Sequence, residues 1–144
     1  MTNRKGFVLA AAVLALMLMA ALVAGVFFAS NEGTRMAVAT ADRHLALVTA
    51  ESLAERAAAN WSTATAPSET GASIASSFDE NGIPGAVYVT RLDSGLFSVV
   101  ASAGPARPGS GITARVGLIL VVKTAADGST SVDRISERWW SELF

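Results

Sequence analysis

The sequence predicts an α+β protein in which one long N-terminal helix, transmembrane in its first half, packs against a small antiparallel sheet of three to four strands. Three observations carry this prediction: an uncharged apolar run, a helical spacing of apolar residues after it, and strand-like alternation toward the C-terminus. The expected organisation is a leader at 1–6, a transmembrane segment at 7–29, a continuing helix at 30–60, a loop at 61–85 and a β head at 86–144.

The composition excludes several function classes. Of 144 residues, 51% are apolar and 16% are charged, which does not fit a disordered chain. The net charge of −1 gives no basic footprint, so nucleic acid is not an expected partner. The chain has no cysteine, which excludes disulfides, cysteine-ligated zinc and thiol catalysis. His44 is the only histidine, and no nucleophile can be tied to it, so we expect neither catalytic residues, a metal site nor a cofactor.

The apolar run from Phe7 to Ala29 holds 23 residues without a charge. As a helix it would be roughly 34 Å long, enough to cross a bilayer core of about 30 Å. Arg4 and Lys5 precede it and should stay in the cytoplasm, which places the rest of the chain outside the inner membrane. A cleaved secretory signal is one interpretation, although its apolar core is usually shorter and Phe27-Phe28-Ala29 puts Phe where a small residue is needed. A simple signal anchor is the second.

A third interpretation starts from the junction Arg4-Lys5-Gly6-Phe7, a basic leader that ends in Gly before an apolar Phe. This junction resembles the prepilin cleavage site of the type IV pilin superfamily. The resemblance implies that a prepilin peptidase cuts between Gly6 and Phe7 and methylates the new N-terminus. Most pilins carry a Glu at the fifth residue of the mature chain, where this sequence has Ala11. Members without that Glu are similar to subunits placed at the filament tip.

The helix is expected to continue from the apolar run to about Ala59, because no Pro occurs before Pro67 and Gly33 is the one weak position. Its apolar residues form two stripes at helical spacing. One stripe contains Val38, Ala41, Leu45 and Val48, and the other contains Ala46, Ala50, Leu53 and Ala57.

The region between Glu32 and Arg56 resembles PilX-like minor pilins, so that the resemblance covers about the first 57 residues. The residues that carry it are Arg35, Met36, Ala37, Asp42, Arg43, Ala50 and Glu51. The resemblance implies a minor pilin, or a type II secretion pseudopilin, that helps to prime assembly or sits at the tip. Its partners would be the prepilin peptidase, other pilin or pseudopilin subunits and the inner membrane. The alternative is an uncleaved single-pass anchor that carries a small periplasmic binding module.

The head is expected to be mostly β, after a Ser- and Gly-rich loop at 62–85 with one helical turn around 72–78. Apolar alternation predicts strands at 86–91, 96–102, 112–124 and 131–135. Asp93-Ser94-Gly95 predicts the turn of a hairpin, and Asp127-Gly128 predicts another. One face of the third strand is uniformly apolar; it contains Ile112, Ala114, Val116, Leu118, Leu120 and Val122.

Two further clusters have more than one interpretation. Asp79-Glu80-Asn81-Gly82 groups oxygen ligands that suit Ca²⁺, but its spacing is not that of an EF-hand and a solvated turn is the simpler interpretation. Trp139 and Trp140 are adjacent, so they would point to different sides of a strand or helix. We expect one of them in the core, and the other either in the core or as an anchor for a partner subunit.

Overall fold

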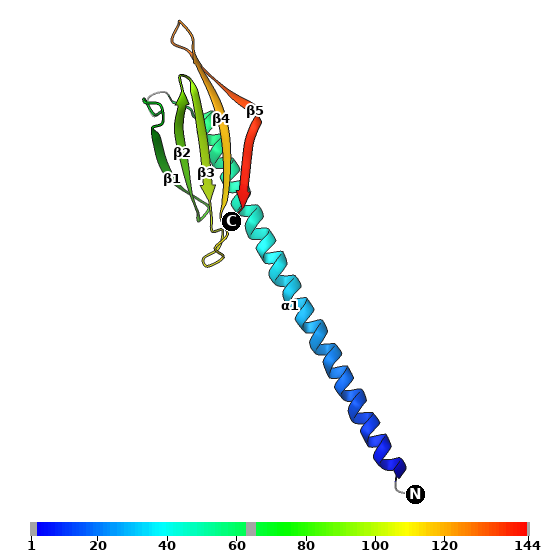
Figure 1. The fold of residues 1–144 in the computed structure, drawn as a ribbon. Coiled ribbons are helices and arrows are strands. Elements are labelled where there is room, and N and C mark those ends of the chain that lie inside the picture. Colours follow the sequence, from blue (N-terminus) through cyan, green and yellow to red (C-terminus); the bar gives the residue numbers. More distant parts are fainter. Residues whose placement is uncertain (1–2, 63–65, 144) are drawn as a thin grey trace. The chain divides into compact units, whose positions relative to one another are not determined.

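The computed structural model describes residues 3–62 and 66–143, with side chains described at 7–62 and 66–135. It confirms the α+β class: one N-terminal helix is followed by an antiparallel sheet that the helix packs against (Figure 1). The elements are α1 (Asn3–Ala59), β1 (Ser73–Glu80), β2 (Ile83–Asp93), β3 (Leu96–Ala103), β4 (Ala114–Thr124) and β5 (Thr130–Leu143). The expectation of three to four strands was wrong, because the sheet has five.

The chain divides into two compact units, Met1–Val38 and Ala39–Phe144, and each is described by itself. The first unit is helical from Asn3 onward, so the helix begins before Phe7, where the sequence placed its start. The helix ends at Ala59 as expected, and the Asn60 N–H still donates to the Arg56 carbonyl (2.9 Å). Arg56 in this last turn complements the partial negative charge of the helix C-terminus.

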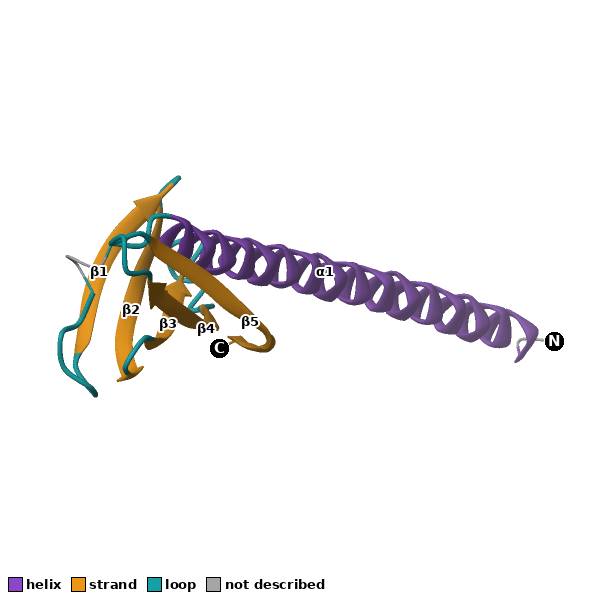
Figure 2. Cartoon of the chain, turned by 90° about the horizontal axis from the view of Figure 1, so that it is seen from above, coloured by secondary structure: helices purple, strands orange, loops and turns teal. Residues whose placement is uncertain are grey.

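The sheet is a meander in the order β1-β2-β3-β4-β5, with every neighbouring pair antiparallel. Figure 2 shows the strands side by side in a curved sheet. The predicted hairpin around Ser94-Gly95 is confirmed, since Asp93 pairs with Leu96 and Gly95 adopts a φ of 81°. The predicted turn at Asp127-Gly128 is confirmed as well, and β5 then runs well beyond the expected strand at 131–135.

The loop expected at 62–85 was wrong, because β1 and the start of β2 occupy its second half and no helical turn forms at 72–78. The two strands join through Asn81 and Gly82, whose φ angles of 55° and 78° suit a two-residue hairpin turn. The Gly82 N–H also donates to Asp79 Oδ1 (2.9 Å). The segment escaped prediction because β1 is rich in Ser and Ala and carries only two large apolar side chains.

The core of the head lies between α1 and one face of the sheet. The helix contributes small residues and one large one, Leu53, which is 2% exposed. The apolar face predicted for the third strand is confirmed at its centre, since Val116, Leu118 and Leu120 are all buried. The other buried hydrophobic residues are Ala46, Ala50, Ala54, Ile83, Val87, Phe97, Val99, Ala101, Ala103 and Ala114.

Candidate functional site

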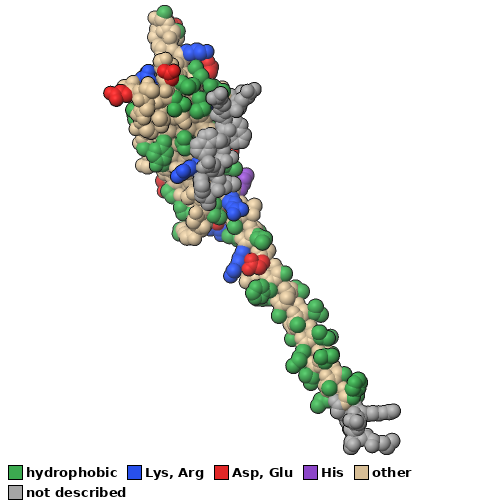
Figure 3. Space-filling model, in the orientation of Figure 1, with side chains coloured by type: hydrophobic (Ala, Val, Ile, Leu, Met, Phe, Trp, Pro, Cys, Tyr) green, Lys and Arg blue, Asp and Glu red, His purple; other side chains and the backbone are tan. Residues whose placement is uncertain are grey.

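The N-terminal unit presents a long apolar surface. Figure 3 shows hydrophobic side chains along this segment, and Phe7 is 75% exposed. α1 is long and apolar enough to cross a membrane, with a mean hydropathy of 2.8 in its most apolar window. Ala11, which the resemblance aligns with the usual pilin Glu, is exposed within the helix. Arg4, Lys5 and Gly6 have helical backbones, and their side chains lie outside the described residues.

The seven residues that resemble the PilX-like segment do not form one surface. Five of the side chains are exposed, namely those of Arg35, Met36, Ala37, Arg43 and Glu51. Ala50 is fully buried against the sheet. Arg35 forms an exposed ion pair with Glu32 (Nη1 to Oε1, 3.7 Å). The seventh, Asp42, is buried. The segment therefore mixes core positions with solvent positions, and its residues share no single role in this fold.

Asp42 ties the helix to the loop after β3. Its side chain is 4% exposed, and Oδ1 accepts a hydrogen bond from Arg107 Nε at 2.7 Å. A buried carboxylate is strongly unfavourable without such a partner, so this pair fixes where the loop docks. Sequence reasoning missed it, because the two residues are 65 positions apart and neither has a local signal.

The two apolar stripes on the helix have different environments within the head. Ala46, Ala50 and Leu53 pack on the sheet and are at most 2% exposed. Leu45 and Val48 on the other stripe are 49% and 46% exposed. The sheet thus covers the stripe that consists of Ala residues and Leu53, and it leaves Leu45 and Val48 about half exposed.

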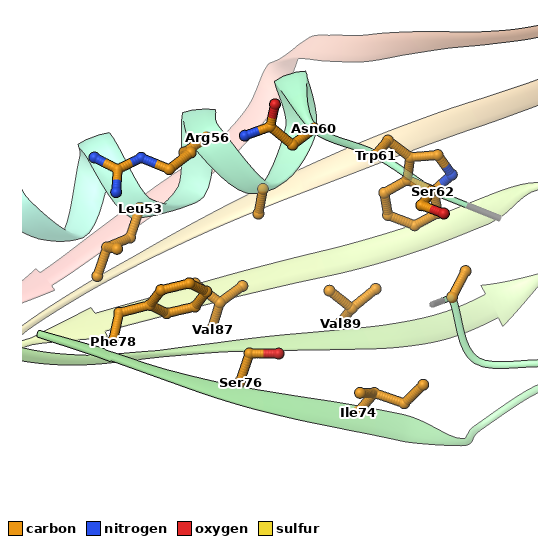
Figure 4. Close-up of a pocket in the computed structure, with 12 residues that line it drawn as sticks. Leu53, Arg56, Asn60, Trp61, Ser62, Ile74, Ser76, Phe78, Val87 and Val89 are labelled. Carbon is orange, nitrogen blue, oxygen red and sulfur yellow. The ribbon is translucent and has the colours of Figure 1, made fainter. Parts of the chain in front are cut away.

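A cavity of about 450 Å³ opens between the end of α1 and the first two strands (Figure 4). This lies within the range of roughly 300–1,000 Å³ typical of ligand pockets. The helix side contributes Leu53, Arg56 and Trp61, and Figure 4 shows side chains of β1 and β2 facing them. The strand residues of the lining are Ile74, Ser76, Phe78, Val87 and Val89.

Contacts of two lining residues, Arg56 and Trp61, join the end of the helix to the sheet. Arg56 Nη2 donates to Glu80 Oε1 at 2.7 Å, which fastens the helix to the end of β1. Trp61 packs edge-on against Phe97, with ring centroids 4.7 Å apart. The Trp61 Nε1 atom is buried, and no acceptor lies within reach among the described residues. A further ion pair, Arg134 with Glu55, connects β5 to the helix.

The remaining candidates whose side chains the structure describes do not assemble into a chemical site. His44 is exposed. Asp79 Oδ1 accepts a hydrogen bond from Gly82 N–H within the hairpin turn, and the Glu80 carboxylate pairs with Arg56. Over the described part of the chain, no three His, Asp or Glu side chains gather as metal ligands would. Trp139 and Trp140 pair with Leu118 and Gly117 along β4, but their side chains lie outside the described residues.

Comparisons with protein families, with curated proteins and with solved structures gave no match. The resemblance of the N-terminal region to type IV pilins therefore stays a prediction from the sequence.

Proposed function

We propose that the chain is a membrane-anchored assembly subunit, similar to the minor pilins of a type IV pilus or to a related type II secretion pseudopilin. The observation that carries the proposal is the continuity of α1 from the leader-like junction, through the apolar run, to the sheet-covered segment that ends at Ala59. The junction Arg4-Lys5-Gly6-Phe7 stands at the start of this helix, where a prepilin peptidase would act.

The mechanism we propose is physical rather than catalytic. The apolar segment would rest in the inner membrane with the head outside, and would then exchange lipid for the helices of neighbouring subunits. Its backbone groups stay hydrogen-bonded within the helix in both environments, so the exchange exposes no unsatisfied polar group. The many Ala residues in the segment permit close helix approach. Leu45 and Val48 would extend the contact beyond the membrane, since they lie exposed on the helix.

Ala11 favours a priming or tip position. A carboxylate within an apolar bundle needs a partner charge, which in pilins is the N-terminal amine of a neighbouring subunit. A subunit with Ala at this place neither requires nor supplies that pairing. It can therefore stand where no subunit lies ahead of it.

The test is the intact mass of the membrane-extracted full chain, produced together with a prepilin peptidase. The proposal expects a chain that has lost residues 1–6 and gained one methyl group on Phe7. Gly6→Val should leave the chain full-length, because a Cβ there blocks close approach of the backbone to the protease. Gly25→Val is the matched control and should be cleaved normally, since the space around Gly25 is open. A full-length wild-type chain would refute the proposal.

The cavity beside Trp61 favours one second candidate, an uncleaved single-pass anchor whose head is a binding module. The same mass measurement separates the two, since this candidate keeps Gly6 and Phe7 joined. Co-purification with assembled filaments would then support the first candidate and not the second.

A further inference from the structure

β1 is an open sheet edge. It is the first strand in the sheet order, and no sixth strand adjoins it among the described residues (Figure 1). Its eight residues keep an unbroken register with β2, without a bulge. Natural edge strands are usually protected by Pro, Lys, a bulge or a covering loop, and β1 contains neither Pro nor Lys. Both faces of the strand are also largely exposed.

The hydrogen bonds and pairings of β2 show which N–H and C=O groups of β1 point away from the sheet. The Pro84 carbonyl accepts from Gly104 (2.9 Å), so the Pro84 backbone faces β3 and not β1. Its partner Asp79 must then direct its own N–H and C=O away from β2. By alternation, Ser73, Ala75 and Ser77 do the same. The outer edge thus presents four N–H donors and four C=O acceptors for which the described residues supply no ladder partner.

The residues of β1 between these outward-facing positions line the cavity with their side chains. Ile74, Ser76 and Phe78 alternate with the outward-facing backbone positions, and all three line the space beneath the end of α1 (Figure 4). Ile74 and Phe78 are 42% and 41% exposed, which is unfavourable for side chains of this size. A strand added beside β1 would lie about 4.8 Å away and would direct alternate side chains to the same face.

We propose that β1 and the adjoining cavity form a docking site for an extended peptide segment of another protein, which pairs with β1 as a sixth strand. The row of alternating donors and acceptors is the chemistry that an extended backbone satisfies, and no compact small molecule matches it along eight residues. The lining selects apolar side chains at every second position of the peptide. Residues 73–78 carry no charge, so the peptide is uncharged over that length. This inference holds whether or not the chain is a filament subunit.

The test uses the full chain in detergent micelles and a fluorescent nine-residue peptide of alternating Thr and Val with a Lys at each end. Fluorescence polarisation should give a Kd of about 1 mM or tighter. Hydrogen exchange at the Ser73, Ala75 and Ser77 amides should slow when the peptide is added. The same peptide with every inner amide N-methylated keeps its side chains but loses its donors, and it should not bind.

Ala75→Pro removes one outward N–H and leaves the bonds between β1 and β2 in place, because the pair of Ala75 with Tyr88 exchanges no ladder bond. It should weaken peptide binding by about tenfold, the effect of losing one or two backbone hydrogen bonds. Ala75→Val keeps the N–H and should bind as the wild type does. Ile74→Asp, which places a carboxylate on the cavity side, should also weaken binding.

Three results would overturn the proposal. The first is no binding at about 1 mM peptide. The second is binding that tolerates Ala75→Pro or the N-methylated peptide, which would assign the cavity to small apolar ligands. The third is a dimer of the chain that Ala75→Pro dissociates, which would assign the edge to a second copy.

Discussion

The contact between Gly85 and Leu53 gives the sharpest test of how the helix docks on the sheet. A Cβ placed on Gly85 would overlap the Cδ1 atom of Leu53 and lie 3.1 Å from the Ser102 carbonyl oxygen. Leu53 is 2% exposed, so its side chain has little room to move. Gly85→Ala should therefore overpack the core and lower the free energy of unfolding by about 1–3 kcal/mol.

Leu53→Ala should lower that free energy by about 2–5 kcal/mol, because it leaves a cavity in the core. The double variant should lose less than the sum of the two, by about 1 kcal/mol or more, since the new methyl group occupies part of the space that Leu53 vacates. Urea denaturation of the full chain in detergent micelles, followed by tryptophan fluorescence, measures all three values.

Leu53→Ala combined with Gly109→Ala is the matched control. Gly109 has open space around it, so its effect should add to that of Leu53→Ala within about 0.5 kcal/mol. If the effects of Gly85→Ala and Leu53→Ala add as closely as those of the control pair, the docking geometry is refuted. Additive effects would mean that the helix does not approach the sheet at Gly85.

Three other predictions concern single sites in the head. Gly95→Ala should destabilise by at least about 2 kcal/mol in the same urea assay, because Gly95 has a φ of 81° and the new Cβ would lie 2.6 Å from a backbone oxygen of β4. Arg107→Met should destabilise by about 2 kcal/mol, since it leaves the buried Asp42 carboxylate without this partner. Hydrogen bonds from the hydroxyl and N–H of Ser129 hold the pKa of Asp127 below its ordinary value, so Ser129→Ala should raise that pKa in a carboxyl ¹³C NMR titration.

The first two of these predictions have their own controls. Gly109 also has a positive φ, but nothing lies near it, so Gly109→Ala should destabilise by only about 1 kcal/mol, the cost of the backbone strain alone. Lys123 and Asp133 form an exposed pair (3.6 Å), and Lys123→Ala should change stability by less than about 1 kcal/mol. Equal effects within either pair would contradict the reasoning. Because the folded state lowers the pKa of Asp127, its contribution is present above the unfolded pKa and is lost as pH falls through the folded pKa.

The part of the fold that the sequence predicted is the part with strong periodicity. The helix and the strands around Val99 and Leu118 follow from apolar spacing at 3.6 or 2 residues, and the hairpin turns at Ser94-Gly95 and Asp127-Gly128 were recognised. β1 was missed because Ile74 and Phe78 alone do not make a convincing strand among Ser and Ala residues. A usable signal was present, however: Asn81-Gly82 is a strong two-residue hairpin sequence, and it should have placed strands on both of its sides.

The contacts at the candidate site join residues that are far apart in the sequence. The partner of Asp42 lies 65 residues away, and the cavity brings together the helix end with two strands that follow it. The spacing of residues along one segment gives no information on contacts between distant segments. These contacts could therefore not be predicted from the sequence. Two apolar stripes on the helix were predicted from the sequence. Nothing in the sequence indicated which of the two stripes the sheet would cover.

The choice between these stripes has a consequence for assembly. Burial of apolar area stabilises a fold by about 0.8 kcal/mol per CH₂ group, so a head that optimised its own stability would cover the stripe with the larger side chains. The sheet instead covers Ala46, Ala50 and Leu53, while Leu45 and Val48 stay about half exposed. Small residues let the helix lie close to the sheet, and contact of Leu45 and Val48 with another surface would add stabilisation that the head alone does not supply. The exposed Leu45 and Val48 side chains would suit contact with a helix of a neighbouring subunit, which is the arrangement that the proposed assembly function requires.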